Sequence, residues 1–125
     1  GRLEMRHIDK NEVATNLRLG RPIEQLLSDR SEDGNLVIRF IRIEKKTWEF
    51  SVALFEVFDC GTTDFLDIYE FSAVDPDFPY GEAKIFFTAE DAIEYSCGEL
   101  NASPEKFVGS GMVQIEYRDA YHPDW

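Results

Sequence analysis

The chain has 125 residues, of which 43% are hydrophobic, and its 25 acidic and 13 basic side chains give a formal net charge of −12. This length suits one domain with a single core, and the hydrophobic fraction excludes a chain that is disordered for most of its length. The negative charge argues against nucleic acid and against an anionic membrane as direct partners, because both are bound through clustered Lys and Arg.

The charge is concentrated in the middle of the chain. Residues 1–46 carry a net charge of +2, residues 47–100 carry −12 and residues 101–125 carry −2. Solubility alone accounts for such a charge in many bacterial cytosolic proteins. A field of this sign also attracts a protein partner with a basic surface, so both interpretations stay open.

Two short helices are predicted near the amino terminus. Asp9 and Glu12 have the spacing of a capping box, and the apolar residues that follow recur at helical intervals as far as Gly20. Pro22 fits the first turn of a second helix, whose apolar stripe extends over residues 22–27.

The stretch from residue 35 to residue 59 predicts the central hairpin of the fold. After a polar loop at residues 28–34, two long apolar runs are interrupted only by a polar corner at residues 44–47. In the second run the large apolar residues occupy even-numbered positions up to Leu54 and then the odd-numbered positions of Phe55 and Val57, so they move from one face of the strand to the other. This change predicts either a β-bulge or burial on both faces at that point.

Two further strands are predicted over residues 65–74 and 84–88. The first follows a turn, and its two faces are mixed in polarity. The loop between them, residues 75–82, contains two prolines and a glycine and cannot continue a ladder.

The main helix is predicted over residues 89–102, with Thr88 as its cap and small apolar residues along one side. The opposite side of this helix is acidic. The last predicted strand is residues 112–121, because its apolar and polar residues alternate so that Ile115 and Tyr117 face the core and Glu116 faces solvent.

These elements predict one α+β domain over residues 1–125. We expect a twisted antiparallel sheet of about five strands, packed by the main helix and by the short amino-terminal helices. Residues 1–5 are expected to be disordered or foreign to the natural protein.

We expect a cytoplasmic protein. No apolar run is long enough to span a bilayer, and no charged and apolar leader opens the chain. Cys60 and Cys97 are expected to be free thiols, as is usual in a reducing compartment, although one disulfide stays an alternative.

The sequence predicts no catalytic residue, cofactor or metal site. His7 and His122 lie near opposite termini, and neither pairs with a cysteine at a familiar spacing. Cys60 is the one candidate for a reactive thiol, but no cationic residue lies near it in the sequence to activate it. The carboxylates of residues 59–67 and 75–82 lack the EF-hand spacing and are expected to be solvated loop residues.

The aromatic content predicts a second apolar face of the sheet, which either the helices cover or an interaction surface uses. Ten Phe, five Tyr and two Trp exceed what one modest core needs. The leading interpretation is a non-enzymatic acidic domain that binds a basic protein, with an interface formed by Arg39, Arg42, Trp48, Phe78 and Tyr80. The alternative is a small-molecule binder or minor enzyme with a pocket between sheet and helix, lined by Trp48, Phe50, Tyr69 and Tyr95. A third reading is a homodimer without a ligand, in which a second copy covers the apolar parity that no helix covers.

Overall fold

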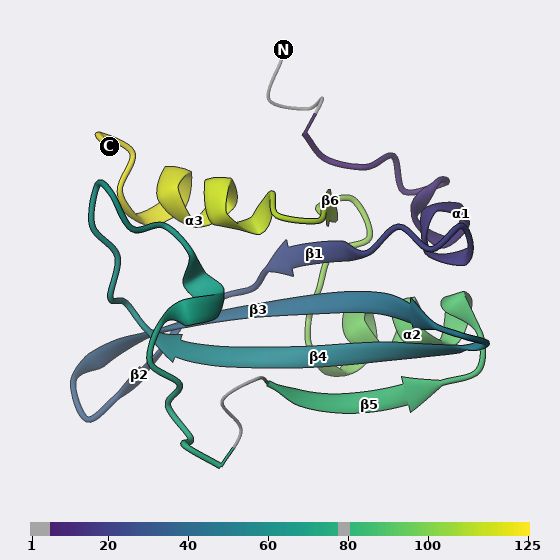
Figure 1. Ribbon diagram of the computed structural model, residues 1–125, viewed down its shortest axis with the longest axis horizontal. Helices are drawn as coiled ribbons and strands as arrows, with labels where there is room; N and C mark the ends of the chain where they lie inside the picture. The colour runs from purple at the N-terminus through teal and green to yellow at the C-terminus, as the bar shows by residue number, and fades with distance from the viewer. Residues whose placement is uncertain (1–5, 78–80) are drawn as a thin grey trace.

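In the described part of the chain, one antiparallel sheet of six strands carries three α-helices and a short 3-10 helix, η2 (Figure 1). The computed structural model describes residues 6–77 and 81–125. The predicted class, a single α+β domain with an antiparallel sheet, is confirmed. None of the described helices is long and apolar enough to cross a membrane. The elements in chain order are α1 (Val13–Arg18), β1 (Ile23–Leu26), β2 (Arg30–Glu32), β3 (Asn35–Lys46), β4 (Glu49–Phe58), η2 (Ile68–Glu70), β5 (Glu82–Phe86), α2 (Ala89–Glu99), β6 (Val108–Gly109) and α3 (Val113–Tyr121).

The strand order is β5-β4-β3-β1-β6, and β2 pairs with the amino-terminal end of β3. β5 and β6 therefore lie at the two ends of this order, and β6 is flanked on its outer side by a bridge from Val108 to His7. β5 confirms the strand predicted over residues 84–88. Asp33 and Gly34, with φ angles of 50° and 82°, form the two-residue turn between β2 and β3, which requires residues that tolerate positive φ. The predicted loop at residues 28–34 thus contains a short strand.

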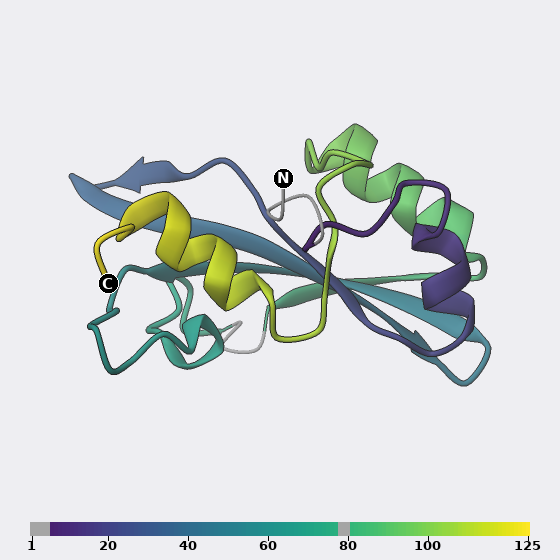
Figure 2. The same ribbon diagram turned by 90° about the horizontal axis from the view of Figure 1, so that it is seen from above.

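β3 and β4 confirm the predicted hairpin and pair without a bulge along the whole of β4. The change of parity between Leu54 and Phe55 therefore has the other predicted cause, burial on both faces. Each face is covered at a different end of the hairpin. Figure 2 shows α2 and α3 at these opposite ends, on opposite sides of the strands.

The first core cluster covers one face of the sheet, at the end where β3 turns into β4. α1 and α2 both pack on this face, so the cluster joins the amino-terminal helix to the main helix. Its principal members are Val13, Leu17, Ile41, Ile43, Phe50, Val52, Ala89 and Ala92.

The second core cluster covers the opposite face at the other end of the hairpin, where α3 and the segment after β4 pack. Phe40 and Phe55 stack at 4.8 Å between ring centroids, and Tyr69 meets both rings edge-on at 5.0 Å. These residues lie on the apolar face of the sheet that a second copy was predicted to cover. The chain itself therefore covers this face. The homodimer stays a prediction. The buried members are Ile38, Phe40, Phe55, Val57, Ile68, Phe71, Val108, Val113 and Tyr117.

α1 and α2 confirm two of the predicted helices. The Thr88 hydroxyl caps α2 by accepting a hydrogen bond from the Asp91 N–H at 3.0 Å. α1 begins only at Val13, because the carboxylate of Asp9 accepts a hydrogen bond from the Asn11 N–H instead of capping the helix.

The helix predicted over residues 22–27 is wrong, because most of this segment forms β1 between β3 and β6. Ile23 belongs to the first cluster and Leu26 packs against the second, so both faces of the strand are buried. Gln25 binds the backbone of Ser103 in both directions, donating to its oxygen at 2.8 Å and accepting from its N–H at 2.7 Å. Ile23 and Leu26 are three residues apart, which would place them on one side of a helix. In the strand they lie on opposite faces, and both faces are buried.

The strand predicted over residues 112–121 is also wrong, because this segment forms α3. Val113 and Tyr117 are buried and Tyr121 packs against the same cluster. Their spacing of four residues fits a helical stripe as well as one face of a strand. Ile115, which was expected to face the core, is only half-buried.

The strand predicted over residues 65–74 is replaced by irregular chain around η2. The Asp67 carboxylate caps this turn by accepting a hydrogen bond from the Tyr69 N–H at 3.2 Å. Ile68 and Phe71 are both buried in the second cluster. Their spacing of three residues is helical and would place them on opposite faces of a strand.

Candidate functional site

A groove lies between α2 and the edge strand β5. It has a volume of about 420 Å³ and combines aromatic and acidic side chains. Successive turns of α2 and the last residue of β5 contribute side chains to its lining. The lining residues, called the acidic groove below, are Phe86, Asp91, Glu94, Tyr95, Gly98 and Glu99.

Three carboxylates border the acidic groove: Asp91, Glu94 and Glu99, all with exposed side chains. Their spacing along α2 places them on the side that faces β5, beside the buried stripe of the helix. Among the described residues none of the three forms an ion pair, whereas the neighbouring Glu90 pairs with Arg18. The groove therefore keeps its negative charge.

Two aromatic rings form the apolar part of the groove. Phe86 of β5 and Tyr95 of α2 lie with their ring centroids 5.0 Å apart. The ammonium of Lys84 lies 5.3 Å from the centroid of the Tyr95 ring, within the range of a cation–π interaction. The ring thus already accepts a cation from its own chain, so its surroundings suit a Lys or Arg side chain.

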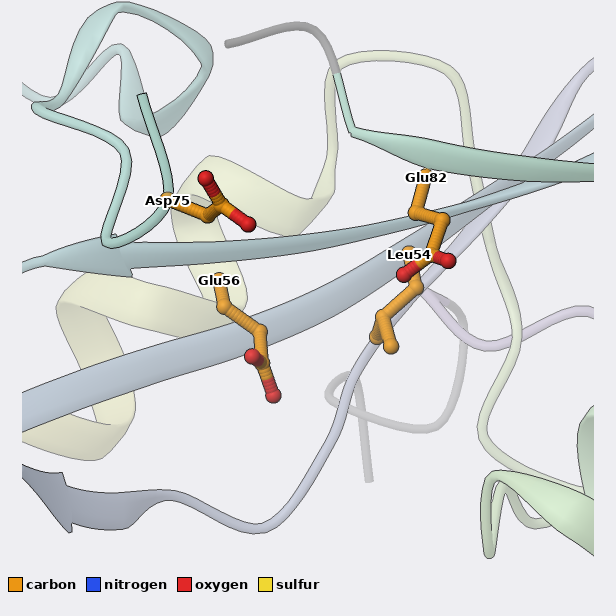
Figure 3. Close-up of a pocket in the computed structure, with 4 residues that line it drawn as sticks. All are labelled: Leu54, Glu56, Asp75 and Glu82. Atoms are coloured by element: carbon orange, nitrogen blue, oxygen red, sulfur yellow. The ribbon is translucent and has the colours of Figure 1, made fainter. Parts of the chain in front are cut away.

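A smaller pocket of about 90 Å³ lies at the other end of β5, lined by Leu54, Glu56, Asp75 and Glu82 (Figure 3). The three carboxylates come from separate segments, and Glu56 points away from Asp75. Glu56 instead binds Arg30 at 3.1 Å and Arg39 at 2.8 Å. Burial alone would raise the pKa of Glu56, but the hydrogen bonds from these two guanidinium groups lower it. No group of three or more His, Cys, Asp and Glu side chains in the described residues is placed to hold a metal ion.

β5 is exposed along most of its length. Ile85 has 52% of its surface accessible, and Phe87, which follows the strand, has 76%. Trp48 at the tip of the β3–β4 hairpin is 76% exposed at the same end of the sheet (Figure 1). Large apolar side chains with this exposure mark a surface that can meet another protein.

The four residues predicted to line a ligand pocket do not come together. Phe50 is buried in the first core cluster, and Tyr69 packs against the second cluster on the opposite face. Trp48 is exposed at the hairpin tip, and only Tyr95 lies in the acidic groove. Tyr95 alone therefore represents the predicted lining at α2, whereas Tyr69 lines a separate pocket of about 340 Å³ with Arg42, Phe55 and Glu70.

The predicted interface residues are also dispersed. Arg39 and Arg42 lie on opposite faces of β3, and each is held by a carboxylate: Arg39 by Glu56 and Arg42 by Glu24. Trp48 is the one member that is both described and strongly exposed. Phe78 and Tyr80 lie outside the described residues.

Glu24 of β1 was missed by the sequence reasoning. It is fully buried, and its carboxylate accepts hydrogen bonds from the N–H groups of Gly111 and Val113 at 2.8 and 3.2 Å, from Arg42 at 2.7 Å and from the Tyr69 hydroxyl at 2.5 Å. Burial and the bond to Glu24 raise the pKa of Tyr69, which keeps its hydroxyl protonated as a donor. The carboxylate thus joins β1 to β3, to η2 and to the start of α3.

A second polar network surrounds Asp59, just after β4. Its carboxylate accepts hydrogen bonds from the Tyr117 hydroxyl at 2.5 Å and from the Gly61 N–H at 3.1 Å, and it lies 2.9 Å from Nε2 of His122. The His122 ring stacks on Trp125 at 3.7 Å. A side chain at residue 61 would stand 2.0 Å from the Tyr117 hydroxyl, so the close approach requires glycine. Asp59 and His122 are too far apart in the sequence for a local pattern to reveal the pair.

The Asp59 network predicts a loss of stability in acid. Burial alone would raise the pKa of Asp59, but the bonds from Tyr117, Gly61 and His122 lower it below its ordinary value of 3.8. The stabilisation by this carboxylate is therefore complete above pH 3.8 and is lost as the pH falls through the lowered pKa of the folded state. In urea melts, Asp59→Asn should be less stable than the parent above pH 3.8, and the difference should shrink as the pH falls below that value.

Asp64→Asn is the matched control, because Asp64 is exposed in the same loop. Its stability should follow that of the parent chain at every pH. A difference between Asp59→Asn and the parent that stays constant down to the lowest pH would contradict the ionised Asp59 network.

The cysteines and the loop carboxylates play no visible part in a site. Cys60 is exposed and Cys97 half-buried, and both are free thiols, as predicted. Burial raises the pKa of the Cys97 thiol, which keeps it in the less reactive protonated form. In the second acidic loop, Asp75 accepts a hydrogen bond from the Asp77 N–H at 2.9 Å, as turn residues do.

No protein-family model, curated protein or solved structure matches this chain. The functional proposal therefore rests on the geometry and charge of α2 and β5.

Proposed function

We propose that the chain is a non-enzymatic protein-binding domain that receives a basic segment of a partner in the acidic groove. The observation that carries this proposal is the pair formed by Tyr95 and Lys84, bordered by three carboxylates without ion-pair partners among the described residues. A ring that accepts a cation, beside carboxylates that lack one, fits a second Lys or Arg supplied from outside.

The charge of the whole chain supports the same partner. The net charge of −12 lies almost entirely between residues 47 and 100, which include both β5 and α2. Such a field speeds the approach of a basic protein and opposes that of an acidic one. Binding through exposed charges should weaken with salt, because the Debye length is about 10 Å at 0.1 M ionic strength.

The test uses a short flexible peptide of Lys, Ser and Gly as the probe. Calorimetric titration should show binding that weakens as salt is added. The combined variant Asp91→Asn, Glu94→Gln and Glu99→Gln should bind at least about tenfold more weakly, since three exposed contacts of about 0.5 kcal/mol each amount to one factor of ten.

The control variant removes the same charge elsewhere: Asp64→Asn, Glu105→Gln and Asp124→Asn, all exposed and all outside the acidic groove. It should lose only the small part of the affinity that depends on net charge. Equal losses in the two variants would mean that net charge and not the groove attracts the peptide, and the proposed site would be abandoned.

A further inference from the structure

We propose that β5 receives the basic segment as an added strand, so that the partner extends the sheet at this edge. The inference rests on the proposed function and specifies its mode: the partner segment is extended, and basic and apolar side chains alternate along it. Strand addition to an exposed edge supplies affinity through backbone hydrogen bonds and specificity through alternate side chains.

The backbone of β5 is available on one side. β5 pairs with β4 from Glu82 opposite Leu54 to Phe86 opposite Phe50, and β4 is its only neighbour among the described strands. At alternate residues the N–H and C=O groups therefore point outward, away from β4. Five residues at about 3.4 Å each give an edge of roughly 17 Å, enough for an extended segment of five or six residues.

The side chains of β5 alternate between two chemically different faces. Lys84 and Phe86 lie opposite Val52 and Phe50, which places them on the face where α2 packs and the acidic groove lies. Ile85 lies opposite Ser51 on the other face, where it is exposed. An added strand would continue this alternation, with every second side chain beside the acidic groove and the others beside Ile85.

This alternation determines the chemistry of the partner. Side chains on the groove face meet Asp91, Glu94 and the ring of Tyr95, so Lys and Arg fit there. Side chains on the opposite face meet Ile85 and the adjacent Phe87, so Val, Ile or Leu fit there.

A second copy of this chain is a poorer occupant. Pairing β5 with β5 in antiparallel fashion would place the two α2 helices on the same face of the joined sheet, and their acidic grooves would flank one junction. Like charges at such a junction repel, and each copy carries −12. A basic segment removes this repulsion.

The decisive experiment compares three peptides in which Lys and Val alternate: one unmodified, one N-methylated at every Lys and one N-methylated at every Val. In an added strand the N–H groups of only one of these two residue types point toward β5. We therefore expect one methylated peptide to bind at least tenfold more weakly than the unmodified peptide, while the other binds within about twofold. Amide hydrogen exchange at the outward-facing residues of Glu82–Phe86 should slow at least tenfold with the unmodified peptide.

Three other outcomes would overturn the inference, and each points to a different cause. If both methylated peptides bind as the unmodified one does, and exchange in β5 is unchanged, strand addition is wrong while binding of the flexible Lys, Ser and Gly peptide still supports the proposed function. If no basic peptide binds, the proposed function fails as well. If exchange in β5 slows with protein concentration alone, and light scattering shows twice the mass of 14.5 kDa, the edge belongs to a second copy.

Discussion

Glu24→Ala is expected to lower the free energy of unfolding by about 3–5 kcal/mol, the cost of breaking a buried pair by removing one partner. The substitution leaves the guanidinium of Arg42 without its carboxylate at 2.7 Å, and it removes the acceptor of the Gly111 and Val113 N–H groups. It also removes the acceptor of the half-buried Tyr69 hydroxyl. Urea unfolding, followed by circular dichroism, gives the difference directly.

The matched control is Glu44→Ala. Glu44 is the other carboxylate beside Arg42, at 3.5 Å, but its side chain is 33% exposed and it accepts no bond from the helix start. Its loss should cost less than about 0.5 kcal/mol, as is usual at a surface position. Equal costs for Glu24→Ala and Glu44→Ala would show that the buried network does not hold β1, β3 and α3 together.

Tyr117→Ala should lower the free energy of unfolding by about 3–5 kcal/mol, the range for removing a large buried aromatic side chain. Tyr117 is fully buried between Phe71 and Tyr121, and its hydroxyl donates to Asp59. Ile115→Ala should cost less than about 1 kcal/mol, because Ile115 is only half-buried on α3.

This pair of substitutions separates the helix from the strand that the sequence predicted. A strand would bury both side chains on one face, so the two costs would be similar. Tyr117→Phe adds a second measurement: it keeps the ring and should lose only about 1–3 kcal/mol for the hydrogen bond to Asp59, whose carboxylate keeps Gly61 and His122 as partners. A cost for Tyr117→Phe equal to that for Tyr117→Ala would place the stabilisation in the hydroxyl and not in the packing.

The sequence predicted the elements whose signals are local. The β3–β4 hairpin is evident from its two long apolar runs, and α2 from the cap at Thr88 and its small apolar stripe. The change of parity at Leu54 was also real, and its cause is two clusters on opposite faces.

The errors come from contacts between distant segments. β1 resembles a short helix in isolation, but Glu24 and Gln25 find their partners at residues 103 and 111–113, and these bonds become available only in the folded chain. At the start of α3, the N–H groups of Gly111 and Val113 donate hydrogen bonds to the Glu24 carboxylate. No side chain next to Val113 in the sequence caps the helix, so no local signal predicts where it begins.

Glu116 illustrates the same difficulty. It was expected to face solvent, yet its carboxylate binds Arg6 at 2.6 Å and His7 at 2.9 Å. For the candidate site, the acidic side of the main helix and Tyr95 were both visible in the sequence. The edge position of β5 was not, because strand order depends on pairing across the whole chain.

The two core clusters lie on opposite faces of the sheet, which separates the effects that amino-acid substitutions have on the two halves of the protein. The acidic groove rests on the first cluster, whereas Glu24 and Asp59 brace the second cluster on the opposite face. Effects of substitutions in groups without shared partners generally add, so altering the groove should leave the stability of the other half almost untouched. The surface proposed to meet the partner can then diverge rapidly while the opposite half preserves the fold.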